Sequence, residues 1–205
     1  MTYIYVYDWI SNWSKKSGRN LSITGLTTLD DIIKEAVNRG YGPSVQNTNL
    51  KKGKYGSSRL SIPKNRCVPI IVDAIRRIFL NTAITQIDFD KWEYELATRI
   101  RNIYHGNGSS LYVYGNAQKW INMAIKFLYS SDSIAPSTKL FEVCYLVIDS
   151  IILNKARKLG VTGLGSAWSK CDDWNIIVAF EKNMIPVAIK IPPYYTRLWW
   201  ECNAW

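Results

Sequence analysis

The chain has 205 residues, of which 47% are hydrophobic and 20% are charged. This length and hydrophobic content suffice for one globular domain, or for two small lobes that share a cleft, and they exclude an intrinsically disordered chain. The 26 Lys and Arg against 16 Asp and Glu give a formal charge of +10, which favours a polyanionic partner such as DNA. A basic protein without such a partner is the alternative.

The cysteines and the N-terminus indicate whether the protein binds metal and where in the cell it acts. Cys67, Cys144, Cys171 and Cys202 follow no CxxC spacing, and His105 is the sole histidine. We therefore expect reduced thiols, no metal site and no cofactor. Residues 1–8 do not resemble a signal peptide, and no apolar run approaches the roughly 20 residues that cross a bilayer. We expect a cytoplasmic protein that does not enter a membrane.

Helical spacing of apolar residues predicts the elements of the first half of the chain. Thr28 and Asp31 form a capping-box-like helix start, and Gly40 is predicted to end that helix. The predicted elements are helices at 28–39 and 69–80, a helix from Asp88 or Asp90 to about Tyr104, and a long loop at 40–66.

The second half of the chain is also predicted to be helical, so the fold class is mostly α with at most minor β structure. If there are two lobes, they span about 1–109 and 110–205. The predicted elements are a helix at 115–129, a loop at 130–137, a helical stretch at 138–159 that breaks near Asp149, a helix at 166–184 and a last helix opened by Pro192 or Pro193. Strand signals are confined to 1–7 and 187–191.

Two charged residues occupy unusual places. Lys119 follows Gly115 closely, in what we predict to be the first helical turn, where the helix dipole disfavours a cation. Asp149 lies thirty residues further on, inside an apolar run of ten residues, where an unpaired charge is costly to bury. The two side chains can form an amine–carboxylate pair. The alternatives are an exposed helix lysine and an aspartate that only caps a helix.

This arrangement resembles the helix-hairpin-helix DNA glycosylase superfamily, in particular its archaeal 8-oxoguanine and bacterial OGG-like branches. The resemblance covers residues 110–158. Gly115 to Lys119 is similar to the hairpin turn and nucleophilic lysine of that family, and the sequence from Val147 to Ser150 is similar to its aspartate motif. The chain differs from the family in having a single hairpin glycine and in having Val147 where the family has proline.

The resemblance implies a two-lobed helical bundle that flips a damaged or modified base out of double-stranded DNA and excises it, with or without lyase activity. Lys119 would attack the sugar, and Asp149 would stabilise its positive charge. A non-catalytic helical module that binds nucleic acid or another protein is the alternative.

Several other residues are candidates for contact with DNA. Gly115 would contribute through the hairpin turn. Gln118 and Asn122 share a helix face and could hydrogen-bond a base edge, or simply be polar groups of the helix surface. Lys126 lies two turns after Lys119 and is expected to contact phosphate or to lie at the surface. Trp168 could stack on an extruded base or pack in the core.

The stretch from residue 36 to 72 carries seven Lys or Arg and no acidic residue. We predict that its basic side chains contact the phosphate backbone, with a solvated surface loop as the alternative. These side chains include Lys51, Lys52, Lys54 and Arg59. An acidic cluster, Asp88, Asp90, Glu93 and Glu95, could suggest a metal-dependent nuclease, but its spacing suits a capped helix start better.

Overall fold

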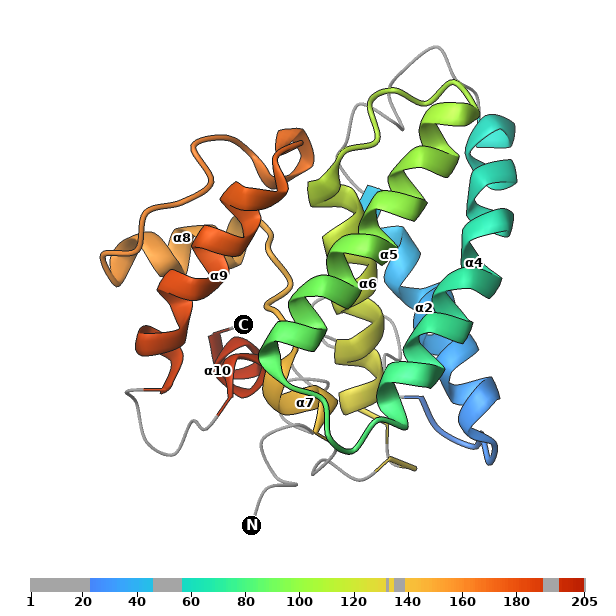
Figure 1. Ribbon diagram of the computed structural model, residues 1–205, viewed down its shortest axis with the longest axis horizontal. Helices are drawn as coiled ribbons and strands as arrows, with labels where there is room; N and C mark the ends of the chain where they lie inside the picture. Colours follow the sequence, from blue (N-terminus) through green and yellow to red (C-terminus); the bar gives the residue numbers. More distant parts are fainter. Residues whose placement is uncertain (1–22, 46–56, 132, 135–138, 190–195, 205) are drawn as a thin grey trace.

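The computed structural model describes residues 23–45, 57–131, 133–134, 139–189 and 196–204 (Figure 1). Within these ranges the chain is mostly helical and contains no strand, which confirms the all-α class. The elements are α2 (Leu29–Val45), α4 (Ser57–Phe79), α5 (Gln86–Gly106), α6 (Tyr114–Tyr129), α7 (Leu140–Val143), α8 (Ser150–Lys158), the 3-10 turn η1 (Trp168–Lys170), α9 (Trp174–Ile189) and α10 (Arg197–Ala204). None of the described helices is long and apolar enough to cross a membrane.

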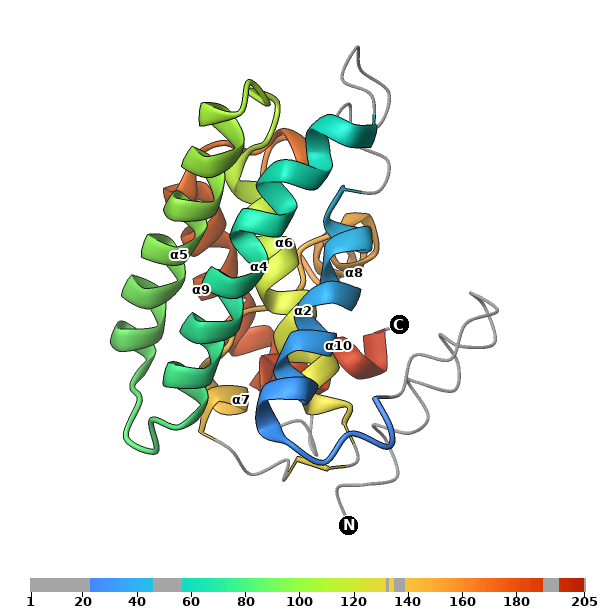
Figure 2. The same cartoon turned by 90° about the vertical axis from the view of Figure 1, so that its right-hand side faces the viewer.

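Helix α6 lies at the centre of the fold. It packs against α2, α5 and η1, and α4 packs against α2 and α5 (Figures 1 and 2). Helix α10 contacts α7, α8 and α9. Buried apolar side chains from all these elements form one continuous core. The predicted lobe boundary near residue 109 therefore lies just before a helix whose main neighbours, α2 and α5, come from the first predicted lobe.

The prediction that the first helix stops at Gly40 is wrong, because α2 continues to Val45. Gly40 lies where α2 crosses α6, and a Cβ there would be 3.0 Å from the backbone oxygen of Trp120. The glycine thus permits close packing of two helices instead of ending one. The indole Nε1 of Trp120 donates to the backbone oxygen of Val37 at 2.8 Å, which fixes the same crossing.

The predicted loop at 40–66 is also too long. Helix α4 begins at Ser57 and contains both Pro63 and Pro69. Its apolar positions, among them Leu60 and Cys67, are buried against the core, and this packing outweighs the polar composition. Helix α5 begins two residues before the predicted start at Asp88, because Thr85 forms a capping box with that aspartate.

The stretch at 138–159 breaks where the sequence predicts. Helices α7 and α8 are separated by residues 144–149, and Asp149 is the N-cap of α8. Residues 144–148, which we call the buried segment, are non-helical and inaccessible to solvent. The strand predicted at 187–191 is wrong, because α9 continues to Ile189. The strand predicted at 1–7 and the helix start at Pro192 or Pro193 lie outside the described residues.

Candidate functional site

The fold brings Lys119 and Asp149 together. The Lys119 Nζ lies 3.6 Å from the Asp149 Oδ2, and the two residues are 8% and 4% exposed. Because α6 begins at Tyr114, Lys119 is in the second turn of the helix and not in the first, as the sequence suggested. Its unusual feature is therefore burial beside the N-cap of α8, and not a place at the positive end of the α6 dipole.

Asp149 acts through both of its carboxylate oxygens. The Oδ1 atom accepts hydrogen bonds from the backbone N–H groups of Ile151 and Ile152, at 2.9 and 3.0 Å, and so caps α8. The other oxygen, Oδ2, faces the amine of Lys119. The cap and the amine partner, which the sequence presented as alternatives, are thus both present.

Trp168 covers the amine. The Lys119 Nζ lies 4.2 Å from the centre of the Trp168 ring, a cation–π distance. Gly115 allows this contact, because a Cβ at that position would be 1.7 Å from the backbone oxygen of Trp168. The Gly115 N–H also donates to the backbone oxygen of Cys171 at 2.9 Å. Gly115 therefore lies in the first turn of α6, where it holds η1, and does not form a hairpin turn.

Burial lowers the pKa of Lys119, and the nearby charge of Lys126 lowers it further. The carboxylates of Asp149 and Glu201 oppose this shift without cancelling it. A lowered pKa increases the fraction of neutral amine near pH 7, and only the neutral amine is a nucleophile. The pair can therefore supply an amine nucleophile beside a carboxylate.

Gln118 and Asn122 are buried, so they are not polar groups of the helix surface. The Gln118 Nε2 donates to the backbone oxygen of Ile148 at 3.1 Å, which anchors the residue before Asp149. The Asn122 Nδ2 donates to the Glu93 Oε1 at 2.6 Å. Their hydrogen bonds go to the protein interior, away from any surface that a base edge could reach.

The expectation that Lys126 lies at the surface is wrong. Its side chain is buried and forms an ion pair with Glu201 of α10. The second oxygen of Glu201 accepts a hydrogen bond from the backbone N–H of Val147 at 2.8 Å. Lys126 thus neutralises the charge of Glu201, and Glu201 holds the buried segment at Val147, two residues before Asp149.

Two further residues hold the buried segment and the end of α7 just before it, and the sequence did not point to either. Glu181 accepts from the backbone N–H of Leu146, at 3.2 Å to each oxygen, and Arg197 donates to the backbone oxygen of Val143 at 2.7 Å. Burial raises the pKa of Glu181 to about 8, although Arg197 opposes the shift. These partners come from α9 and α10, far along the chain, and no local spacing marks them.

The predicted basic and acidic sites lie apart from the Lys119–Asp149 pair in the chain. Lys51, Lys52 and Lys54 lie outside the described residues, and Arg59 lies in the first turn of α4. Among the residues that the structure describes, no group of His, Cys, Asp and Glu could hold a metal ion. In the acidic cluster, Asp88 belongs to the cap of α5, whereas Glu93 is buried.

No protein-family model matches the chain, and no curated protein or solved structure shows significant similarity to it. The pairing of Lys119 with Asp149 beneath Trp168 is therefore the main structural feature from which a function can be inferred.

Proposed function

We propose that the protein is a DNA glycosylase with lyase activity, in which Lys119 is the nucleophile and Asp149 stabilises the reacting sugar. The observation that carries the proposal is the buried Lys119 amine, whose pKa is lowered and which lies 3.6 Å from the Asp149 carboxylate. The charge of +10 and the resemblance of residues 110–158 to helix-hairpin-helix glycosylases support DNA as the substrate.

In the proposed reaction, the neutral Lys119 amine attacks C1′ of a flipped nucleotide. The bond between C1′ and the base breaks, and the base leaves with the bonding electrons and takes up a proton. Opening of the sugar ring gives a Schiff base, and loss of a proton from C2′ expels the 3′ phosphate and nicks the strand. Asp149 stabilises the positive charge that develops on the sugar and can accept a proton.

Trp168 must leave the amine before a nucleotide can reach it, because Lys119 is only 8% exposed. The indole lies on a three-residue 3-10 turn that follows a stretch containing Gly163 and Gly165. Once displaced, the ring is available to stack on the extruded base, an interaction worth about 1–3 kcal/mol. This motion assigns Trp168 a role in admitting the substrate.

The test is borohydride trapping on duplexes that carry an abasic site or one of a panel of modified bases, with base release scored in parallel. We expect a covalent adduct with the wild type and none with Lys119→Gln. Lys155→Gln is the matched control, because Lys155 is an exposed lysine of α8, whereas Lys119 is buried. Asp149→Asn retains an oxygen to cap α8 and should fold, but it should lower turnover by orders of magnitude.

An adduct of equal yield with Lys119→Gln would contradict the assignment of the nucleophile. Wild-type turnover in Asp149→Asn would reduce Asp149 to a cap. If no duplex gave either an adduct or a released base, the glycosylase proposal would fail, and the non-catalytic binding module would replace it.

A further inference from the structure

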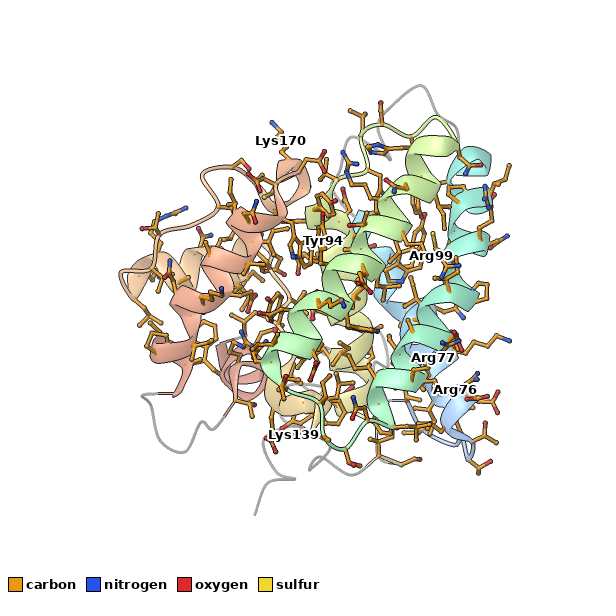
Figure 3. All side chains as sticks on the ribbon, in the orientation of Figure 1. Arg76, Arg77, Tyr94, Arg99, Lys139 and Lys170 are labelled. Atoms are coloured by element: carbon orange, nitrogen blue, oxygen red, sulfur yellow. The ribbon has the colours of Figure 1, made fainter. Side chains whose placement is uncertain are left out.

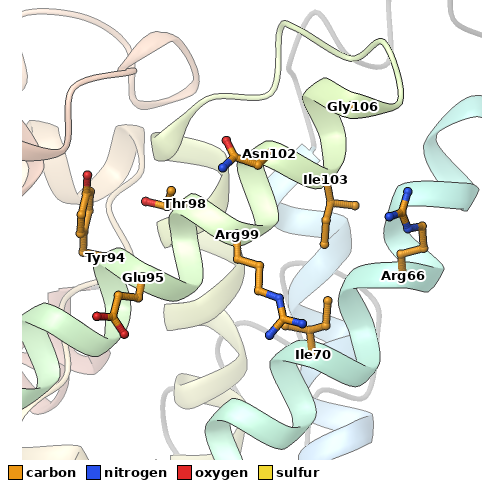
Figure 4. A pocket seen from close by; sticks show the side chains of 9 residues that line it. All are labelled: Arg66, Ile70, Tyr94, Glu95, Thr98, Arg99, Asn102, Ile103 and Gly106. Atoms are coloured by element: carbon orange, nitrogen blue, oxygen red, sulfur yellow. The ribbon is translucent and has the colours of Figure 1, made fainter.

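Two surface hollows, each of about 750 Å³, lie on the face formed by α5 and its neighbours. Neither is lined by Lys119 or Asp149. The first lies between α4 and α5, and its lining includes Arg66, Ile70, Tyr94 and Arg99 (Figure 4). Their volume is within the range of about 300–1,000 Å³ that ligand sites occupy.

The first hollow, which we call the α4–α5 groove, carries two arginines that have no hydrogen-bond or ion-pair partner among the described residues. Arg66 and Arg99 extend from the two helices into the groove, beside Ile70 and Ile103 (Figure 4). Both arginines are exposed, and neither forms a hydrogen bond or ion pair with a described residue. By contrast, Arg77 on the same helix α4 forms an ion pair with Asp73 at 2.8 Å.

An aromatic platform adjoins the groove. Tyr94 is 44% exposed and lines both hollows. Its ring stacks on that of Tyr114, with centres 6.1 Å apart and an angle of 27° between the planes, and it lies 5.8 Å from the ring of Trp174. Figure 3 shows Tyr94 and Arg99 on the same face of the molecule. A planar group placed on Tyr94 would thus lie at one end of the hollow that Arg99 and Arg66 also line (Figure 4).

We propose that the α4–α5 groove binds a single strand of nucleic acid, with phosphates at Arg66 and Arg99 and a base stacked on Tyr94. Exposed guanidinium groups bind phosphate oxygens well, and the exposed ring of a tyrosine can stack on the face of any base. Asp172 beside the platform does not repel the strand strongly, because Arg101 forms two hydrogen bonds to its carboxylate, at 2.7 and 2.5 Å. Glu95 is the one acidic residue that lines the groove in the part of the chain described.

A nucleic acid fits this face better than an acidic peptide. Both ligands could use the two arginines, but a run of carboxylates has no group that needs the platform of Tyr94. The inference shares only its class of partner with the proposed glycosylase activity. Binding is measured without turnover, so the groove and the chemistry at Lys119 can fail independently.

The experiment measures binding of a fluorescent oligo-dT of twelve nucleotides by anisotropy over a series of salt concentrations. Arg66→Gln/Arg99→Gln should make the slope of log affinity against log salt shallower by about 1.4, because each phosphate contact on a single strand contributes about 0.7. Arg77→Gln/Lys182→Gln is the control, since it also removes two positive charges, but from exposed side chains outside the groove. The control should retain nearly the wild-type slope.

Tyr94→Leu should weaken binding roughly 5- to 150-fold, the effect expected when one base loses its aromatic partner, while leaving the salt slope unchanged. Since all these side chains are exposed, circular dichroism should show an intact fold in each variant. Equal slopes for the groove and control variants would overturn the proposal. A second pair of results would also overturn it: poly-glutamate competes as effectively as unlabelled oligo-dT, and Tyr94→Leu binds with wild-type affinity.

Discussion

Replacing Gly40 by alanine should destabilise the protein, although alanine is the better helix former. Gly40 lies inside α2, where it faces α6. A Cβ at this position would be 3.0 Å from both the backbone nitrogen of Ala124 and the backbone oxygen of Trp120, and 3.3 Å from the Cβ of Met123. Two of these three neighbours are backbone atoms of a helix, so they cannot move aside as a flexible side chain would.

Two opposing effects set the magnitude. Alanine in place of a helical glycine stabilises a helix by about 1 kcal/mol. Relief of the contacts, however, requires α2 and α6 to separate by several tenths of an ångström along a crossing that the Trp120 hydrogen bond to Val37 also fixes. Overpacking of this kind costs about 1–3 kcal/mol, and loosening the crossing adds to it. We expect a net loss of about 1–2 kcal/mol, which for a chain of this size lowers Tm by roughly 2–8 °C.

Urea unfolding, followed by tryptophan fluorescence and circular dichroism, measures this loss. Gly106→Ala is the control, because Gly106 is also helical but a Cβ there meets nothing within 4 Å. Gly42 has the same open surroundings, but it precedes Pro43, which disfavours a helical conformation in any larger residue. Gly106→Ala should be neutral or stabilising. If Gly40→Ala were as stable as Gly106→Ala, the close crossing of α2 and α6 would be refuted.

Two further predictions concern the buried charges. Burial raises the pKa of Glu181 to about 8. Between about pH 4.5 and 8, the folded protein therefore keeps a proton on Glu181 that the unfolded chain has lost. Because the folded state binds more protons in this range, the free energy of unfolding falls as pH rises. Glu181→Gln should flatten that fall, and equal pH profiles for variant and wild type in urea unfolding would contradict the assignment. Lys126→Met should cost about 3–5 kcal/mol by leaving Glu201 buried without its cation. Adding Glu201→Gln should recover most of this loss, since glutamine still accepts from Val147; no recovery in the double variant would show that the ion pair is not the cause.

The sequence was sufficient for the helices whose apolar residues recur at helical spacing. In α2, Ile32, Ile33, Ala36 and Val37 are all buried, as that spacing requires. The break at Asp149 could also be predicted, because a carboxylate in an apolar run needs either backbone N–H groups or a cation. In the structure Asp149 has both partners.

The sequence was insufficient where a distant element decides the local structure. The sequence predicts a helix end at Gly40. The glycine is instead needed because the backbone of α6 comes so close that a Cβ would not fit. The β-branched and apolar residues at 187–191 fit a strand as well as a helix, and Val187 follows Pro186. In the structure this stretch is helical, as part of α9, as far as Ile189, and Ala188 is buried in the core.

The buried carboxylates were missed for the same reason. Glu181 and Glu201 have ordinary helical surroundings in the sequence, and their partners are backbone N–H groups of residues 35 and 54 positions earlier in the chain. A side chain that bonds to a distant backbone leaves no local periodicity. The pairing of Lys119 with Asp149 was suggested by the place of Asp149 in an apolar run and by a first-turn position of Lys119, and the structure places Lys119 in the second turn instead.

The buried segment links the architecture to the electrostatics of the candidate site. A non-helical segment in the core cannot satisfy its own backbone groups, so Glu181 and Glu201 accept from its N–H groups. When these groups are ionised, they bring negative charge into the interior, and each then requires a cation there. Lys126 supplies one of these cations, and its charge in turn helps to lower the pKa of Lys119.

The described interior holds one carboxyl group more than it holds cations. The buried carboxyl groups are Glu93, Asp149, Glu181 and Glu201, and the buried cations are Lys119, Lys126 and Arg197. Burial and the charge of Glu181 raise the pKa of Glu93 well above its usual range. The Glu93 Oε2 and the Asn122 Oδ1 both lack a hydrogen-bond partner among the described residues, although the two side chains are bonded through their other atoms. A proton on Glu93 would supply the missing donor between these two oxygens. Because the pKa of Glu181 is also raised, to about 8, both of these carboxyl groups favour the neutral form near pH 7. The remaining buried carboxylates, Asp149 and Glu201, then face the cations Lys119 and Lys126, and Lys119 can lose its proton while Arg197 stays charged in the core.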